Sequence, residues 1–129
     1  MQTAQKSIVA IVDDDERTLS SLGDLLEAAG FVVRAYSSAT ALIHGHGLAG
    51  IDCLVSDIGM PDMSGLELRN IATMQRPDLP VILITGRPKA AWLATSDIDP
   101  GRYFEKPYDG CKLVAAIFAA TADARGERS

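Results

Sequence analysis

The sequence predicts an α/β domain built on a doubly wound parallel sheet of five strands. Five short runs rich in β-branched residues alternate with longer segments whose apolar residues recur at helical spacing. Three of the short runs are apolar on both faces, like strands of a parallel sheet that helices cover on both sides. At 129 residues, 47% hydrophobic and 22% charged, the chain is long enough for one well-buried domain and short for two. We expect one domain over residues 1–122 and a polar C-terminal tail over residues 123–129.

Five strands are expected in chain order. They are IVAIV (residues 8–12), FVVRAY (31–36), CLVSD (53–57), VILIT (81–85) and RYFEK (102–106). Because strands and helices alternate along the chain, the strands are expected to run in the same direction and to be joined by right-handed crossovers. Their carboxyl ends then lie along one edge of the sheet, called the carboxyl edge below. Ligands bind beside that edge in this architecture.

Helical spacing of apolar residues marks five segments that would pack on the sheet. The segments are residues 19–26, 38–46, 66–71, 88–95 and 113–118. The third helix has the clearest start, because Ser64 and Glu67 have the S-x-x-E spacing of a capping box. Gly30 marks the end of the first helix, and Asp109 is the expected N-cap of the last.

Charge and cysteine content narrow the class of function. A net charge of −5 and a pI of about 4.8 argue against direct binding of nucleic acid, which attracts basic surfaces. Cys53 and Cys111 lie in apolar surroundings without the CxxC spacing of metal or redox sites, so both are expected to be buried free thiols. No signal pattern opens the chain, and its longest apolar stretch is far shorter than a membrane span. We expect a soluble cytoplasmic protein without membrane contact.

Polar side chains gather at the ends of the predicted strands, on the carboxyl edge. They are Asp13, Asp14, Asp15 and Glu16 after the first strand, Asp57 on the third, Thr85 on the fourth and Lys106 on the fifth. Carboxylates from neighbouring strands repel one another, and a divalent cation relieves that repulsion. Mg²⁺ fits because it prefers oxygen ligands, whereas zinc would call for His or Cys. Lys106 and Thr85 offer a positive charge and a hydroxyl for phosphoryl oxygens, which predicts a site for phosphoryl transfer.

Asp57 is the expected nucleophile of this site. A carboxylate can attack phosphorus to give an aspartyl phosphate, and the reaction needs mainly positioning and charge neutralisation. The turn IGMP that follows is expected to point the backbone carbonyl of Gly59 at the metal. Asp15 and Glu16 are assigned to capping and charging of the first helix instead, since acidic runs are common at helix starts.

Four motifs in chain order resemble those of the receiver domain of two-component response regulators. They are IVAIVDDDERTL, LVSDIGMPDMSGLEL, VILITG and YFEKPY, and they span nearly the whole chain. The resemblance implies a flavodoxin-like (βα)5 fold with strand order 2-1-3-4-5. The segments MPDMSGLEL and ITG are most similar to the sequences of one branch of the family, whose members carry a helix-turn-helix output domain and control transcription.

The resemblance also implies roles for individual residues. Asp57 would be the phosphoacceptor, Asp13 and Asp14 the acidic pair serving Mg²⁺, Thr85 the switch hydroxyl, Lys106 the phosphate-binding lysine and Tyr103 the switch aromatic. The peptide bond between Lys106 and Pro107 would be cis.

A phosphorylation switch is the function that follows from the resemblance. A sensor histidine kinase would give its phosphoryl group to Asp57, and the surface of the fourth helix, fifth strand and fifth helix would change to control an output domain or a target protein. The chain would not be an enzyme, beyond assisting its own phosphorylation and dephosphorylation. Two alternatives stay open: a receiver-like interaction module that is not phosphorylated, and a Mg²⁺-dependent phosphatase. Such phosphatases typically carry a second Asp two residues after the nucleophile, where this chain has Gly59.

The segment between Thr85 and Lys106 departs from the family pattern. GRPKAAWLATSDIDPGRYF replaces the usual fourth helix and the turn that follows it. This region contributes to dimer and target contacts in the family, so dimerisation stays open. Gly59 and Arg87 lie two positions beyond Asp57 and Thr85, and we hypothesise that they alter water access and hence phosphate lifetime.

Overall fold

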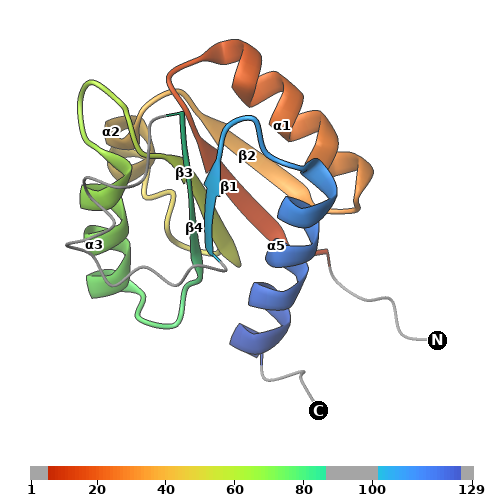
Figure 1. Cartoon of the computed structure of the whole chain (residues 1–129). Coiled ribbons are helices and arrows are strands. Elements are labelled where there is room, and N and C mark those ends of the chain that lie inside the picture. Colours follow the sequence, from red (N-terminus) through yellow and green to blue (C-terminus); the bar gives the residue numbers. More distant parts are fainter. Residues whose placement is uncertain (1–5, 87–101, 126–129) are drawn as a thin grey trace.

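A computed structural model describes residues 6–86 and 102–125 of the chain (Figure 1). Its elements are β1 (Ile8–Val12), α1 (Glu16–Ala28), β2 (Val32–Tyr36), α2 (Ala39–His44), β3 (Cys53–Asp57), α3 (Gly65–Gln75), β4 (Val81–Thr85), β5 (Tyr103–Glu105) and α5 (Gly110–Arg125). The strands form one parallel sheet in the order β2-β1-β3-β4-β5. The predicted α/β class and strand order are thus confirmed. The expected fourth helix and Arg87 lie outside the described residues.

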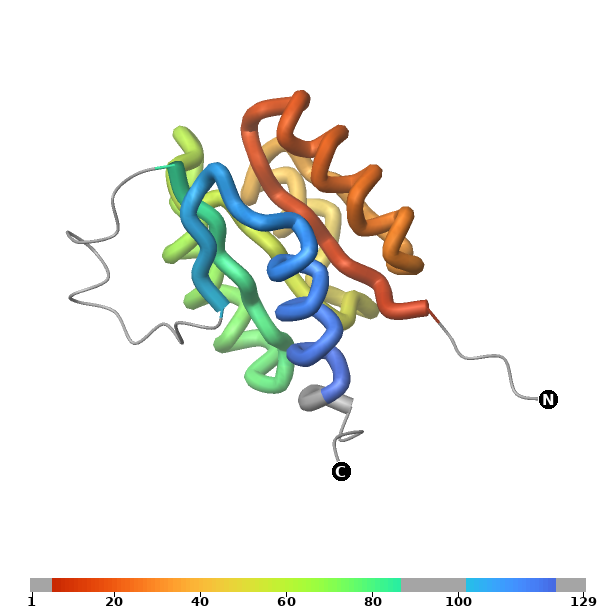
Figure 2. Tube along the Cα trace, turned by 45° about the vertical axis from the view of Figure 1, so that its right-hand side comes forward, coloured from red at the N-terminus to blue at the C-terminus, as the bar shows by residue number. Residues whose placement is uncertain are grey.

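Helices cover both faces of the sheet. In Figure 2, α1 in orange and α5 in blue lie on the same side, and Figure 1 shows α2 and α3 on the other. Because successive residues of a strand point to opposite faces, β1 supplies Val9 and Ile11 to the core under α1 and α5, and Ala10 and Val12 to the core under α2 and α3. β3 and β4 are buried along their whole length. The sheet is therefore doubly wound, as predicted.

The strand register aligns the carboxyl ends of four neighbouring strands. The last pairs are Val12 with Ser56, Asp57 with Ile84, and Thr85 with Glu105. One residue further, the backbone N–H of Lys106 donates to the carbonyl oxygen of Thr85 at 2.7 Å. The residues that follow β1, end β3 and β4, and follow β5 thus share the carboxyl edge.

Three helices begin with the caps that the sequence predicts. The Asp15 side chain accepts a hydrogen bond from the N–H of Arg17 at 3.0 Å and caps α1. Ser64 and Glu67 form the complete capping box of α3, with each side chain accepting from the other residue's N–H at 3.1 Å. The Asp109 side chain accepts from the amide two residues later at 2.9 Å, at the start of α5. Side-chain oxygens thus satisfy amides that lack partners inside the helices.

The second strand begins one residue later than predicted, because the backbone of Phe31 takes part in the cap that follows α1. Its N–H donates to the carbonyl oxygen of Leu26, and the N–H of Gly30 donates to that of Glu27, each at 3.0 Å. With Gly30 at φ 102°, these two bonds form a Schellman motif, which needs a left-handed residue at this point. The Phe31 ring packs against Phe118 of α5, with 4.6 Å between the ring centroids.

Several smaller expectations need correction. Cys53 is buried in β3 as predicted, but Cys111 is exposed. The prediction for Cys111 was wrong because the second residue of α5 faces solvent, while Leu113 and Ile117 face the sheet. The second helix is shorter than predicted, the fifth strand loses one residue at each end, and α5 is longer than the predicted segment 113–118. None of the described helices has the length and apolar character needed to cross a bilayer.

Arg76, the C-cap residue of α3, holds the loop between α2 and β3. Its Nη1 donates to the carbonyl oxygens of Leu48 and Ile51, each at 2.9 Å. Arg76→Met keeps much of the apolar stem but removes both charged hydrogen bonds, so we expect the free energy of unfolding to fall by about 2–4 kcal/mol in a urea titration. Asp78→Ala is the control, because its ion pair with Arg76 is long, at 3.7 Å, and Asp78 is 70% exposed. Equal losses in the two variants would contradict this role.

Candidate functional site

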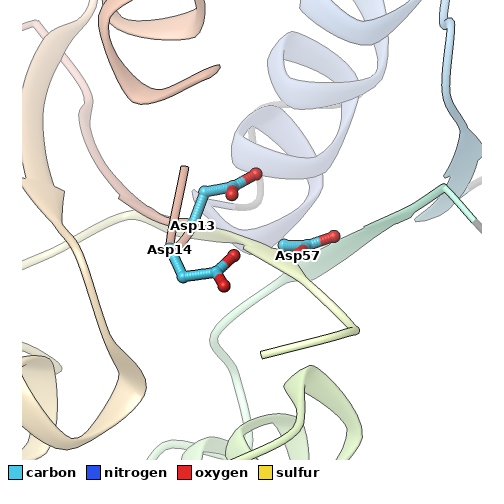
Figure 3. Close-up of side chains that lie close together, drawn as sticks. All are labelled: Asp13, Asp14 and Asp57. Carbon is cyan, nitrogen blue, oxygen red and sulfur yellow. The ribbon is translucent and has the colours of Figure 1, made fainter. Parts of the chain in front are cut away.

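Three carboxylates meet at the carboxyl edge of the sheet. Asp13 and Asp14 directly follow β1, and Asp57 ends the neighbouring strand β3. Each can offer one oxygen such that the three oxygens all lie within 4.8 Å of one another, and Figure 3 shows the three side chains gathered there. Asp13 and Asp57 are only 3% and 7% exposed, whereas Asp14 is exposed. The cluster therefore joins a buried pair of acids to one acid at the surface.

Lys106 brings a positive charge to the buried pair. Its Nζ lies 3.2 Å from Oδ2 of Asp13, to which it donates a hydrogen bond, and 3.6 Å from Oδ1 of Asp57. The hydrogen bond from the backbone N–H of Lys106 to the carbonyl oxygen of Thr85 fixes the position of the Lys106 backbone, from which this side chain extends. Three carboxylates and one ammonium leave two net negative charges when all four groups are ionised. The lysine thus offsets only part of the acidic charge.

The pKa directions reflect this imbalance. Burial raises the pKa of Asp57, the charges of Asp13 and Asp14 raise it further, and the Lys106 ammonium opposes them. Burial lowers the pKa of Lys106, but the nearby Asp57 and Asp13 carboxylates outweigh that effect, so its pKa is raised. Lys106 therefore keeps its positive charge at neutral pH. The ionised form of Asp57 has a higher free energy in this site than an ionised carboxylate exposed to water.

The donor set fits Mg²⁺. The three grouped side chains offer only carboxylate oxygens, and no His or Cys joins them among the described residues. Hard oxygen donors with excess negative charge suit a small divalent cation that keeps some of its waters. Asp13, Asp14 and Asp57 are the side chains that would hold it. Gly59, the fourth predicted ligand, is exposed two residues beyond Asp57, and its role stays a prediction.

Thr85 lies at the carboxyl edge, whereas Tyr103 lies further back on the sheet, and neither is part of the acidic group. Thr85 is 1% exposed at the end of β4, beside the backbone of Lys106. Tyr103 opens β5 opposite Leu83 and packs partly buried against the core under α2 and α3. Their switch roles stay predictions. The Lys106–Pro107 bond is cis, as the resemblance implies.

Two features of the site were missed by sequence reasoning. Gly65, the first residue of α3, lies directly against the backbone of Asp57. Asp62, in the loop between β3 and α3, accepts hydrogen bonds from Thr40 of α2. The first could have been suspected from the glycine after Ser64, but the second links residues 22 positions apart and leaves no local signal.

Comparisons with known proteins agree with this geometry. The family model of the response regulator receiver domain matches residues 9–118. Response regulator protein TmoT of Ectopseudomonas mendocina is 35% identical over 118 residues, which cover 90% of this chain and 53% of TmoT. Transcriptional regulatory protein FixJ of Azorhizobium caulinodans is 33% identical over 114 residues, which cover 87% of this chain and 54% of FixJ. The chain thus spans about half the length of these two relatives.

The fold agrees with solved structures as well. The crystal structure of a response regulator receiver domain protein from Clostridium thermocellum superimposes with a TM-score of 0.81 at 27% identity. The match covers 95% of this chain and 99% of that one.

Proposed function

The chain belongs to the response regulator receiver domain family of two-component systems, and we propose that it is a switch phosphorylated on Asp57 by a sensor histidine kinase. The observation that carries the proposal is the position of the Asp57 carboxylate. It lies 3.6 Å from the Lys106 ammonium and within the acidic cluster. A nucleophile, a phosphate-binding cation and a set of metal-binding oxygens are thus combined at one edge of the sheet.

In the proposed reaction, an Asp57 oxygen attacks the phosphorus of a phosphohistidine. The P–N bond breaks, its electron pair returns to the imidazole nitrogen, and a new P–O bond forms to Asp57. Bound Mg²⁺ would neutralise part of the charge on the phosphoryl oxygens. Lys106 would contact a phosphoryl oxygen and Asp13 would hold the lysine in place, as their 3.2 Å hydrogen bond suggests. Thr85 would donate its hydroxyl to another phosphoryl oxygen, and Tyr103 would then shift inward.

The signal would pass to a partner or an output region. In the proposal, the new charge on Asp57 changes the surface around β5 and α5 together with the segment before β5. The family includes proteins named as transcriptional regulators, which favours control of transcription as the output. We further propose that the chain acts in the cytoplasm, does not bind nucleic acid itself, and turns over no substrate other than its own phosphoryl group.

The test is the intact mass of the protein after incubation with acetyl phosphate and Mg²⁺. The wild type is expected to gain one phosphoryl group, and Asp57→Ala is expected to gain none. EDTA should abolish the adduct, while Asp24→Ala, which removes an exposed acid of α1 that is not part of the acidic cluster, should keep it. A folded wild type that gains no adduct under any condition would overturn the proposal and favour an interaction module that is not phosphorylated.

A further inference from the structure

Asp62 connects the loop between β3 and α3, residues 58–64, to helix α2. Its Oδ2 accepts two hydrogen bonds from Thr40, one from the backbone N–H at 3.1 Å and one from the side-chain Oγ1 at 2.5 Å. The loop and α2 lie beside each other in Figure 1. The hydroxyl and the amide of Thr40 keep the pKa of Asp62 below its usual range, so this acceptor is ionised at neutral pH. Asp62 thus makes a charge-assisted contact with a neighbouring helix.

Helix α2 is itself held in place by the core, so it can anchor this contact. Ala39 and Leu42 are fully buried against the sheet. The Ser38 side chain caps the helix by accepting from the N–H of Ala41 at 3.0 Å. The N–H of Thr40 is another first-turn amide without a partner inside the helix, and Asp62 supplies its acceptor. The loop is therefore tied to a helix that the core holds in place.

The inner part of the loop is anchored separately. The N–H of Ile58 donates to Ile84 at 2.8 Å, and the carbonyl oxygen of Ile58 accepts from Met60 at 3.1 Å and from Gly65 at 2.9 Å. Gly59 is therefore the central residue of a three-residue turn. Among the described residues, no loop hydrogen bond ends on the Gly59 carbonyl. The Gly59 carbonyl oxygen is therefore available to bind a metal ion. Its direction depends on how the loop is held on both sides, by the bonds of Ile58 at its inner limb and by the bonds of Asp62 at its outer limb.

We propose that the Thr40–Asp62 contact positions this loop for metal binding, by holding its outer limb so that the Gly59 carbonyl faces the acidic cluster. The inference rests on the proposed function, since it takes Mg²⁺ to bind at that cluster. Mg²⁺ demands near-ideal octahedral geometry, so a ligand that samples several positions binds it more weakly. A loop that is ordered before binding loses less conformational entropy on binding. Thr40 and Asp62 are positioning residues and do not contact the metal.

Four variants separate the hydrogen bonds from the charge. Thr40→Val removes the hydroxyl at nearly constant shape and charge, and Asp62→Ala removes the acceptor. Thr40→Ser keeps the hydroxyl, and Asp62→Asn keeps an acceptor oxygen without the charge. We expect the Kd for Mg²⁺, from an NMR titration of backbone amides, to rise about threefold in Thr40→Val and about tenfold in Asp62→Ala. Thr40→Ser should stay within about twofold of the wild type, and Asp62→Asn, whose hydrogen bonds are neutral and weaker, should fall between the wild type and Asp62→Ala.

Two further readouts distinguish positioning from a general loss of stability. Phosphorylation by acetyl phosphate should slow in Thr40→Val and Asp62→Ala at limiting Mg²⁺ and recover at saturating Mg²⁺. In the metal-free proteins, amide exchange over residues 59–63 should speed up, while exchange in the strands stays unchanged. A slower rate that saturating Mg²⁺ does not restore would overturn the inference.

The outcomes distinguish this inference from the proposed function. If the wild type neither binds Mg²⁺ nor gains a phosphoryl group, both fail. If the wild type does both, and Thr40→Val and Asp62→Ala bind Mg²⁺ as tightly, only the positioning role fails. If Asp62→Asn weakens binding as much as Asp62→Ala while Thr40→Val has no effect, Asp62 acts through its charge, and the positioning role also fails.

Discussion

Replacing Gly65 by alanine is expected to destabilise the domain by on the order of 3 kcal/mol. A Cβ at this position would lie 2.4 Å from the carbonyl oxygen of Asp57 and 2.9 Å from the Cα of Ile58. Both are backbone atoms at the end of a central strand, so no side-chain rotation can relieve the clash. The start of α3 or the end of β3 must move. Because Asp57 is part of the displaced backbone, Mg²⁺ binding should weaken even at temperatures where the variant stays folded.

Gly23→Ala is the matched control for this change. Gly23 lies inside α1, and a Cβ there would meet Ile11 and Val33 side chains at 3.8 Å, which is ordinary contact. Alanine is favoured over glycine in a helix interior, so this variant should gain up to about 1 kcal/mol. Urea unfolding of the two variants should therefore give changes of opposite sign. A Gly65→Ala protein as stable as the wild type would show that α3 is not pressed against the Asp57 backbone.

The sequence was informative about the sheet and the acidic cluster for the same physical reason. Apolar β-branched runs mark strands, and in a parallel sheet the residues at the strand ends must meet at one edge. Asp13, Asp57 and Lys106 were thus predicted to be neighbours without any knowledge of distances, and the structure brings them within 4 Å of the lysine nitrogen. The α3 capping box could also be predicted from the sequence, because both partners lie within one turn of helix.

The remaining features depend on tertiary contacts that no local pattern encodes. Phe31 looks like a strand residue by composition, but the Schellman bonds that end α1 engage its backbone. The apolar neighbours of Cys111 suggested burial, yet they lie on the other side of the helix. The Thr40–Asp62 contact joins two polar residues that would each be assigned to solvent in isolation. Pairings of this kind arise only when separate elements pack together.

Asp57→Asn is expected to stabilise the metal-free protein at neutral pH, because the amide removes a buried negative charge that Asp13 and Asp14 repel. Burial, Asp13 and Asp14 raise the pKa of Asp57 above its ordinary value of 3.8. A carboxyl with a raised pKa in the folded state binds protons more readily there than in the unfolded chain. Its contribution to stability therefore falls as pH rises from about 3.8 through the folded pKa. The variant should lack this fall, although Lys106 loses one of its two partners.

Adding Mg²⁺ should reverse the comparison between the wild type and Asp57→Asn. A ligand that binds only the folded state stabilises it by about 2.7 kcal/mol at a hundred times its Kd, and the wild type should gain more than a variant that lacks one carboxylate. Denaturant unfolding from pH 4 to pH 8, with and without Mg²⁺, measures both effects, and Asp24→Asn on the exposed face of α1 should follow the wild type throughout. A metal-free Asp57→Asn protein less stable than the wild type at neutral pH would mean that Lys106 already balances the acids. In that case the repulsion among Asp13, Asp14 and Asp57 would not be what makes the site attract a cation.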